Sequence, residues 1–278
     1  MRVRIWGCRG SLATPGPQTV RVGGNTSCVE VRGTDGRVLV LDAGTGVRPL
    51  GLKLQAERHA RIDLLLTHFH LDHIEGLGFF APLFDSECDL HIWGPAWEER
   101  SLRDRVASYV SPPLFPVPFD RIPGKFTFHE IWREEWELGG VRVRCEPVVH
   151  PGPTLAYRLE EHDRSFAFIP DNEPALETDL SSPNGDVSGL AIARGADLLF
   201  HDAQYTADEY RTRVGWGHSA LPDFARFVQL AEPRQVLMFH HDPAHGDEMV
   251  DEMLHEAREL SGRADLDIGR EGFEADLR

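Results

Sequence analysis

The sequence contains no run of about 20 apolar residues, which is the length that a membrane-spanning helix needs. Its first residues, MRVRIWGCRGS, pass directly from a short strand pattern to a glycine turn. They lack the apolar stretch that marks a secretory signal. These two absences predict a cytoplasmic protein without a membrane partner.

Cysteine is scarce and dispersed. The four cysteines are Cys8, Cys28, Cys88 and Cys145, and no two of them form a CxxC pair. Such spacing in a chain of this size is typical of reduced thiols rather than of disulfides or thiolate metal clusters. Cys88 and Cys145 stand in strand-like runs, and we expect them to be small core residues.

Basic charge is also in short supply. Lys and Arg number 29 against 45 Asp and Glu, which gives a formal net charge of −16. A field of this sign repels nucleic acid, and no block of basic residues offers a docking stripe for it. The sequence therefore predicts a small-molecule substrate and no extended nucleic-acid surface.

The residues that are present predict a folded core with strands and helices in both halves. Hydrophobic residues make up 41% of the 278 and charged residues 27%, as in a soluble domain. Apolar alternation or short apolar runs predict strands at 2–6, 28–32, 37–42, 62–67, 90–94, 141–148, 154–160, 164–171, 196–202 and 235–241. Helical spacing predicts helices at 47–60, 220–231 and 246–261.

Strands separated by helices in both halves favour an α/β fold, an αββα sandwich in one domain that covers residues 1–278. The two strands at 154–160 and 164–171 are expected to form a hairpin. The proline-rich stretch 111–124 is predicted to be a long loop. It could serve as a lid, as a wall of the substrate site or as a contact in a homodimer.

The most informative stretch is LLLTHFHLDH at 64–73, where an apolar strand ends and four potential metal ligands follow. Imidazole suits zinc and similar transition metals, and a carboxylate adds charge that can be shared with a second ion. His68 and His70 can face one ion, while Asp72 and His73, just beyond the turn, can face another.

This stretch resembles the HxHxDH signature of the metallo-β-lactamase superfamily, and the resemblance extends over nearly the whole chain. It implies that Asp42, in LDAGTG at 41–46, supports the histidine loop. It also implies a histidine ligand at His150 in EPVVHPGP and a bridging aspartate at Asp171 in FAFIPDNEP. Asp202, at the end of the next apolar strand, is the alternative to Asp171.

The last ligand implied by the resemblance is a histidine in LMFHHDP, where His240 is preferred and His241 is the alternative. Two divalent cations are then expected, with Zn preferred over Mn or Fe. One ion would be held by His68, His70 and His150, the other by Asp72, His73 and His240, with Asp171 shared. His201 is left undecided. The other histidines stand in charged or surface-like contexts, namely His59, His91, His129, His162, His245 and His255.

Further motifs are similar to the tRNase Z-like branch of that superfamily. LLFHDAQY at 198–205 resembles its HEAT motif with Asp202 in the place of the glutamate, and VGWGHSA at 214–220 resembles its glycine–histidine–serine loop. The opening IWGCRGSLATPGP and GGNTSC at 23–28 match its N-terminal pattern. A second histidine in HFHLDH argues against the redox branch, and the lack of a cysteine ligand argues against zinc β-lactamases.

The resemblance implies a mechanism in which two cations activate a shared water, and the hydroxide attacks phosphorus in line. The predicted catalytic residues are Asp72, His218 and Asp202. His218 would protonate the leaving alkoxide, and Asp202 would hold its imidazole in the charged form.

The chain departs from tRNA 3′-processing enzymes in one respect. Those enzymes carry an extended basic arm, and the short interval between His150 and Asp171 leaves no room for one. We therefore expect a phosphodiesterase for a small phosphodiester, such as a cyclic nucleotide or cyclic phosphate. A lactonase or other ester hydrolase is the main alternative, and tRNA processing and a non-enzymatic binding role are less favoured.

Overall fold

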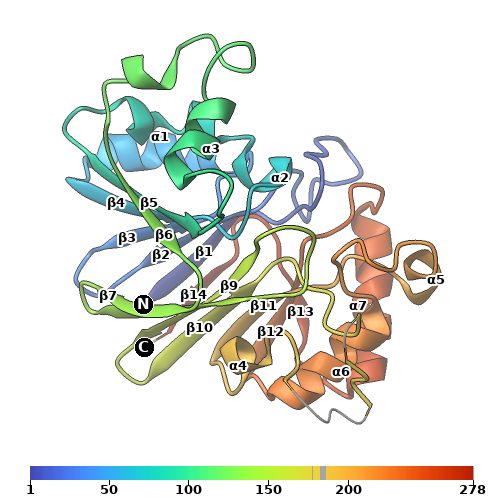
Figure 1. Ribbon diagram of the computed structural model, residues 1–278. Coiled ribbons are helices and arrows are strands. Elements are labelled where there is room, and N and C mark those ends of the chain that lie inside the picture. The colour runs from blue at the N-terminus through green and yellow to red at the C-terminus, as the bar shows by residue number, and fades with distance from the viewer. Residues whose placement is uncertain (177, 182–185, 278) are drawn as a thin grey trace.

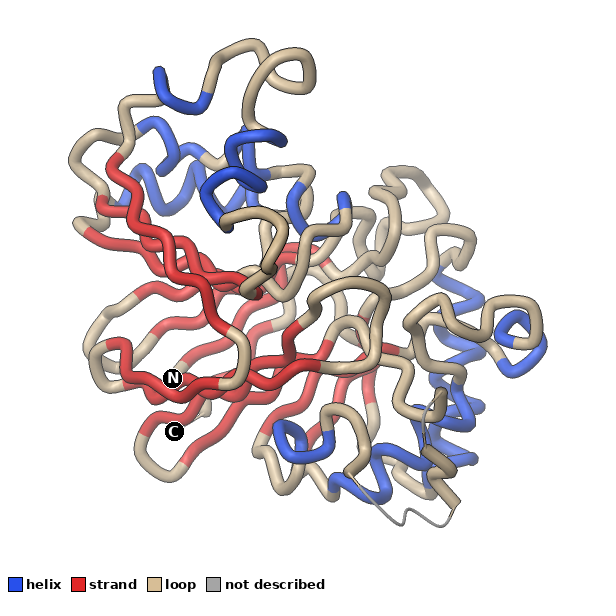
Figure 2. Tube along the Cα trace, viewed as in Figure 1, coloured by secondary structure: helices blue, strands red, loops and turns tan. Residues whose placement is uncertain are grey.

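Two seven-stranded sheets face each other in the computed structural model of the chain, which describes residues 1–176, 178–181 and 186–277 (Figure 1, Figure 2). The first sheet has the order β14–β1–β2–β3–β4–β5–β6. Its strands are β1 (Arg2–Gly7), β2 (Cys28–Arg32), β3 (Val38–Leu41), β4 (Arg61–Leu65), β5 (Asp89–Pro95), β6 (Lys125–Ile131) and β14 (Glu274–Asp276). Strands β3 to β6 run parallel to one another.

The second sheet has the order β13–β12–β11–β10–β9–β8–β7. Its strands are β7 (Glu134–Leu138), β8 (Val141–Pro147), β9 (Leu155–Glu161), β10 (Arg164–Ile169), β11 (Leu198–Asp202), β12 (Gln235–Phe239) and β13 (Asp267–Ile268). Strands β10 to β13 run parallel, and β9 forms antiparallel pairs with β8 and β10. Strand β8 therefore points in the same direction as β10.

Helices cover the outer face of each sheet. Figure 1 shows α1 (Val47–Glu57) and α3 (Leu102–Tyr109) over the first sheet, and α4 (Leu190–Ala193), α6 (Leu221–Ala231) and α7 (Asp247–Ser261) over the second. The remaining helices are the short α2 (Leu71–Ile74) and α5 (Ala207–Tyr210), with 3-10 turns at Leu77–Phe79, Ala81–Phe84 and Phe119–Arg121. The αββα sandwich predicted from the sequence is confirmed as a single domain.

The alternation of side chains along the strands explains the layers. In β3, Leu39 and Leu41 lie in the apolar cluster between the sheets, whereas Val38 and Val40 lie in a second cluster beneath α1. Successive residues of a strand point to opposite faces, so a strand that is covered on both sides is apolar throughout. This is why β3, with the sequence VLVL, appears as a short continuous apolar run.

The structure adds elements that the sequence analysis missed. Strands β6 and β7 lie at sheet edges, and β7 has the largely charged sequence EEWEL. Edge strands expose one side to solvent and commonly carry charge, so their apolar pattern is weak. Strands β13 and β14 are too short to give a pattern, and helix α3 was also not predicted. The helix predicted at 47–60 ends earlier, at Glu57, because Arg58 adopts a left-handed conformation.

The chain ends meet at one edge of the first sheet, where β14 pairs with β1 (Figure 1). The Met1 ammonium donates to the Leu277 carbonyl oxygen at 3.1 Å and lies 2.7 Å from the buried Glu161 carboxylate. Among the described residues, none of the helices is long and apolar enough to cross a bilayer.

Candidate metal centre

The predicted site residues follow the carboxyl ends of strands that point the same way within each sheet. In the first sheet, Asp42 follows β3 and His68 follows β4; in the second, His150 follows β8, Asp171 follows β10 and His240 follows β12. The carboxyl ends of parallel strands meet at one edge of a sheet, where open α/β sheets bind their ligands. Because the two sheets face each other, these five residues lie close together.

The histidine loop is fixed by a buried carboxylate. Asp42 accepts hydrogen bonds from the Thr67 backbone N–H at 2.8 Å and from the Thr67 hydroxyl, and it lies 2.7 Å from His73 Nδ1. His70 precedes α2, and the single turn of this helix carries Asp72 and His73, which are both buried. Asp42 therefore supports the loop as predicted, through Thr67 and His73.

Two groups of three side chains each bring their ligand atoms within 4.8 Å of one another, as the sequence analysis paired them. In the first group, His70 Nδ1 lies 3.0 Å from His150 Nε2, and His68 completes the set. In the second, His240 Nε2 lies 3.0 Å from Asp72 Oδ2 and 3.2 Å from His73 Nε2. We call these the His68 group and the Asp72 group.

Asp171 lies between the two groups. Its carboxylate oxygens are 3.1 Å from His73 Nε2 and 3.4 Å from His240 Nε2 on one side. On the other side they are 3.7 Å from the Nε2 atoms of both His68 and His150. A single carboxylate thus faces ring nitrogens of both groups.

The donor set fits divalent cations. Within the described part of the chain, His68 Nε2 and Asp171 Oδ1 are buried yet make no hydrogen bond. Buried polar atoms of this kind are rare and call for an explanation such as an ion. Ring nitrogens of His70 and His150 lie 3.0 Å apart, and those of His73 and His240 lie 3.2 Å apart, with carboxylates beside them. Zinc and similar metals prefer such a set of nitrogen and oxygen ligands.

Electrostatics at the His68 group also suits metal binding. Burial lowers the pKa of His68 well below its ordinary value and that of His150 to about 4, so both rings are neutral, the form that binds a metal. Burial alone would raise the pKa values of Asp72 and Asp171, but the facing imidazoles outweigh it, and both pKa values fall below the ordinary value.

Three of the histidines in the two groups have a hydrogen-bond partner at Nδ1, the ring nitrogen that points away from the other ligand atoms. His73 Nδ1 lies 2.7 Å from Asp42, His240 Nδ1 lies 2.7 Å from Gln204 Oε1, and His150 Nδ1 lies 2.8 Å from the Gly217 carbonyl oxygen. Such partners set the ring orientation and the tautomer. Sequence reasoning missed Gln204, although it stands in the quoted motif LLFHDAQY.

The N-terminal glycine turn also reaches the centre. The Ser11 backbone N–H donates to Asp72 Oδ2 at 2.7 Å. A β-carbon at Gly10 would lie 2.3 Å from His240 Nδ1, so only glycine allows the backbone to pass this close to the ring. The motif WGCRGS therefore has a structural role at the centre that the sequence analysis did not assign.

The alternatives left open by the sequence have other contacts. His241 Nε2 lies 2.8 Å from the Gly269 carbonyl oxygen, away from both groups. Asp202 accepts hydrogen bonds from the backbone N–H groups of Asn172 and Gln204 and pairs with His218. Its carboxylate lies beside the Asp72 group, within 4.8 Å of ligand atoms of His218 and His240. His201 is buried, and its ring centroid lies 4.2 Å from that of Phe227.

One histidine was wrongly described from the sequence. His245 was expected in a surface-like context but is buried, with Nε2 2.8 Å from Glu209 Oε1. Its backbone carbonyl also accepts a hydrogen bond from the buried Arg9 guanidinium at 2.6 Å. The turn before α7 is therefore part of the interior, which its polar sequence does not indicate.

His218 and Asp202 form a pair beside the centre. His218 Nδ1 lies 2.8 Å from Asp202 Oδ2. Burial alone would lower the pKa of His218, but the Asp202 carboxylate outweighs it and raises this pKa to about 9. The centroid of the His218 ring lies 4.9 Å from that of the His240 ring and 5.1 Å from that of the His150 ring, so His218 contacts both groups.

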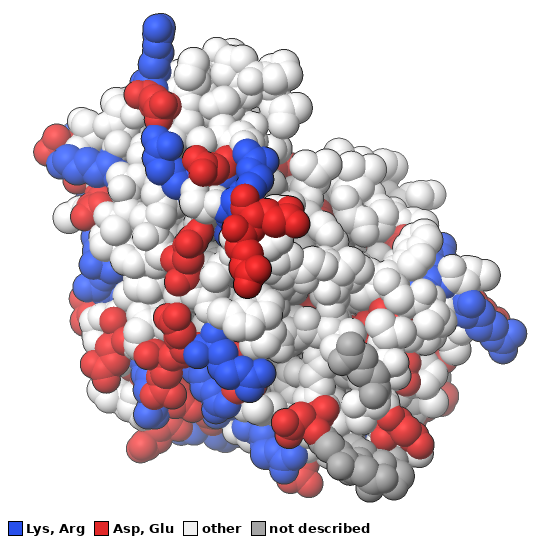
Figure 3. Space-filling model, in the orientation of Figure 1, with Lys and Arg blue, Asp and Glu red and all other residues white. Residues whose placement is uncertain are grey.

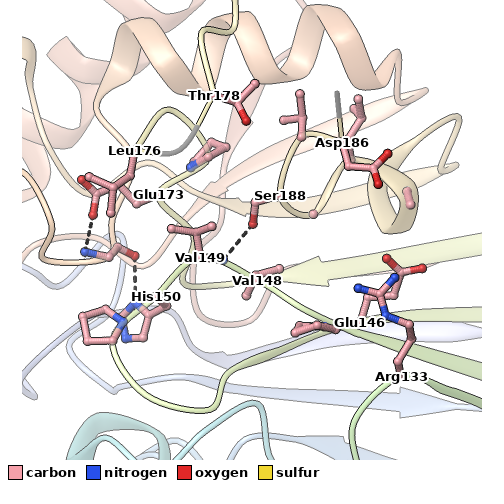
Figure 4. Close-up of a pocket in the computed structure, with 18 of the residues that line it drawn as sticks. Arg133, Glu146, Val148, Val149, His150, Glu173, Leu176, Thr178, Asp186 and Ser188 are labelled. Atoms are coloured by element: carbon pink, nitrogen blue, oxygen red, sulfur yellow. Dashed lines mark hydrogen bonds between the residues drawn. The ribbon is translucent and has the colours of Figure 1, made fainter. Parts of the chain in front are cut away.

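A pocket of about 830 Å³ lies on the other side of His150, with Arg133, Glu146 and Ser188 among its lining residues (Figure 4). His150 and Gly217 are also among the lining residues, and the His150 side chain is 0% exposed. The pocket therefore shares one residue, His150, with the His68 group.

Comparisons with known proteins agree with this geometry. Residues 37–241 match the family model described as "Beta-lactamase superfamily domain". A ribonuclease Z from Mycobacterium sp. (strain KMS) is 28% identical over an alignment that covers 83% of this chain and 81% of the relative.

Solved structures show the same fold. The metallo-beta-lactamase fold protein YhfI from Bacillus subtilis matches with a TM-score of 0.71 at 18% identity, over 99% of this chain and 98% of that one. A diphosphatase from the PhnP family matches with a TM-score of 0.68 at 17% identity, over 100% of this chain and 98% of that one. With the family match over most of its length, the chain belongs to the β-lactamase superfamily and is a metallo-β-lactamase-fold hydrolase.

Proposed function

We propose that the protein is a dinuclear metal-dependent phosphodiesterase that hydrolyses a small phosphodiester, such as a cyclic nucleotide or a cyclic phosphate. The observation that carries this proposal is the position of His218. Its ring is paired with Asp202 and contacts one histidine of each group. A proton donor then stands beside two adjacent cation positions, as cleavage of a phosphodiester with a poor leaving group requires.

The residues that would hold the ions are those of the two groups. His68, His70 and His150 would bind one ion and Asp72, His73 and His240 the other, with Asp171 shared. When bound, two divalent ions, Zn preferred over Mn or Fe, lower the pKa of a shared water and neutralise charge on the phosphoryl oxygens.

The chain's own groups supply the rest of the chemistry. The Asp202 carboxylate holds His218 at Nδ1, which leaves Nε2 as the atom that can donate a proton to the departing alkoxide. Burial lowers the pKa of His218, but the Asp202 carboxylate outweighs it and raises this pKa to about 9 in the metal-free protein, which favours the protonated imidazole. Asp72, fixed by the Ser11 N–H, adds negative charge to the second cation position.

A ribonuclease acting on precursor tRNA is the second candidate, because the ribonuclease Z relatives favour it. Two observations weigh against it. The net charge is −16, and Figure 3 shows Lys and Arg interspersed with Asp and Glu on the face in view, with no continuous basic track. The described residues between His150 and Asp202 form the β9–β10 hairpin and α4 rather than a basic arm; residues 177 and 182–185 lie outside the described part.

An ester hydrolase or lactonase would use the same two groups but has no need of His218. A panel assay of the metal-loaded protein separates these functions. Bis(p-nitrophenyl) phosphate should be hydrolysed faster than p-nitrophenyl phosphate, an acyl lactone or a β-lactam, and mature ends should be released from precursor tRNA slowly or not at all. Activity confined to lactones would contradict the proposal, and efficient tRNA processing would favour the second candidate.

A further inference from the structure

The buried carboxylate of Glu173 binds the loop that leads to His218. Its Oε1 atom accepts the Tyr210 hydroxyl and the Gly215 N–H, both at 2.7 Å, and its Oε2 atom accepts the Gly217 N–H at 2.6 Å. It is 1% exposed, and no ion pair involves it among the described residues. A buried carboxylate without a cation requires such hydrogen bonds, so carboxylate and loop stabilise each other.

The loop has a conformation that needs an anchor. Gly215 and Gly217 have φ angles of +84° and +89°, which residues other than glycine rarely adopt. A β-carbon at Gly217 would lie 2.2 Å from His150 Nδ1, so the loop backbone passes directly against that ring. The absence of a side chain lets the backbone come this close to the ring, but glycine also makes the loop backbone more flexible. The two hydrogen bonds from Gly215 and Gly217 to Glu173 restrict that flexibility.

The Gly217 residue connects Glu173 to a predicted metal ligand. Its N–H donates to Glu173, and its carbonyl oxygen accepts from His150 Nδ1 at 2.8 Å (Figure 4). The other nitrogen of that ring, Nε2, is 3.0 Å from His70 Nδ1 in the His68 group. Displacing Gly217 would therefore turn the ring that completes this group.

We infer that Glu173 is a positioning residue that sets the metal affinity of the His68 group through Gly217 and His150. The inference rests on the proposed metal centre. In the Asp72 group the Nδ1 atoms have partners outside this loop, Asp42 for His73 and Gln204 for His240, and the loop meets this group through the His218 ring. Glu173 should thus influence the His68 group more strongly than the Asp72 group.

The variant Glu173→Gln tests the inference with little change in volume. An amide offers one oxygen and one NH₂ group, so an N–H would face a glycine N–H and one loop contact would be lost. Metal-free protein is titrated with Co²⁺, and the two stepwise affinities are obtained from the absorption spectrum and from competition with a chelator. Loss of an orienting contact typically weakens metal binding about 10–100-fold, and this loss should fall mainly on one of the two steps.

Two controls separate positioning from general destabilisation. Glu161 is also a buried carboxylate that holds a loop, through the Thr34 N–H at 2.7 Å, but its ion pair is with the Met1 ammonium and not with the metal centre. Glu161→Gln should lower Tm and leave both affinities unchanged. Tyr210→Phe removes one contact of Glu173 while keeping both glycine contacts, and should also keep both affinities.

Unchanged affinities in Glu173→Gln, or equal losses at both steps, would overturn the inference. Failure of the proposed function would appear differently. It would show as a wild-type protein that binds two ions but does not hydrolyse phosphodiesters, and the selective effect of Glu173→Gln on one step would still stand.

Discussion

His218 Nδ1 lies 2.8 Å from Asp202 Oδ2, and both side chains are buried beside the two ligand groups. Asp202 is fixed in turn by the backbone N–H groups of Asn172 and Gln204. The imidazole therefore has a defined orientation and a charged partner, the arrangement that general acid catalysis requires.

Replacing His218 should affect substrates according to their leaving group. General acid catalysis contributes ~10²–10⁴-fold, or roughly 3–5 kcal/mol of barrier. A ribose alkoxide needs that proton and nitrophenolate does not. His218→Ala should therefore reduce turnover of a cyclic nucleotide far more than turnover of bis(p-nitrophenyl) phosphate, at unchanged metal content, and Asp202→Asn should give the same pattern more weakly. Equal losses on both substrates would show that His218 binds the phosphate or supports the metals instead.

The same pair predicts a pH dependence of stability. The pKa of His218 is raised from 6.5 to about 9 in the folded protein. Protonated His218 therefore stabilises the fold fully below about pH 6.5, and this contribution is lost as the pH rises through about 9. In metal-free protein, the free energy of unfolding from urea titrations should fall more steeply over this interval in the wild type than in His218→Gln. Parallel curves would contradict the raised pKa.

Metal content should distinguish Asp171 from His241. Asp171 faces ring nitrogens of both groups, whereas His241 contacts the Gly269 carbonyl oxygen. Asp171→Ala should lose most of its bound metal on dialysis, and His241→Ala should retain about two ions per chain despite reduced stability. Elemental analysis of both purified variants measures this, and the reverse ranking would refute both placements.

Gln204 should matter through His240. Replacing it with methionine removes the acceptor of His240 Nδ1 at similar size. Metal binding to the Asp72 group should weaken about 10–100-fold, as measured by chelator competition. The control Gln229→Met changes an exposed glutamine on α6 and should bind metal as the wild type does. A Gln204 variant indistinguishable from this control would show that the amide does not orient the ring.

Much of the fold could be predicted because its central strands are covered on both faces. Strand β3 is apolar throughout and β4 largely so, and the polar residues just after them mark the edge where ligands gather. The HxHxDH spacing then places His68, His70, Asp72 and His73 on one loop without knowledge of the rest of the fold.

The contacts that orient the ligands could not be predicted, because they join segments far apart in the sequence. Gln204 reaches His240, and Glu173 reaches His150 through Gly217. A lone glutamine or glutamate has no distinctive spacing, and its role depends on which strand ends meet. The turn at His245 is also held by a distant segment, since Arg9 near the other end of the chain donates to the His245 carbonyl oxygen.

The central claim is most directly tested by the rate of bis(p-nitrophenyl) phosphate hydrolysis while metal-free protein is titrated with Zn²⁺ or Mn²⁺. The two groups joined by Asp171 predict that the rate rises with added metal and reaches its plateau at about two equivalents per chain. Full activity without metal, or a metal-loaded protein that leaves the diester intact, would contradict the account.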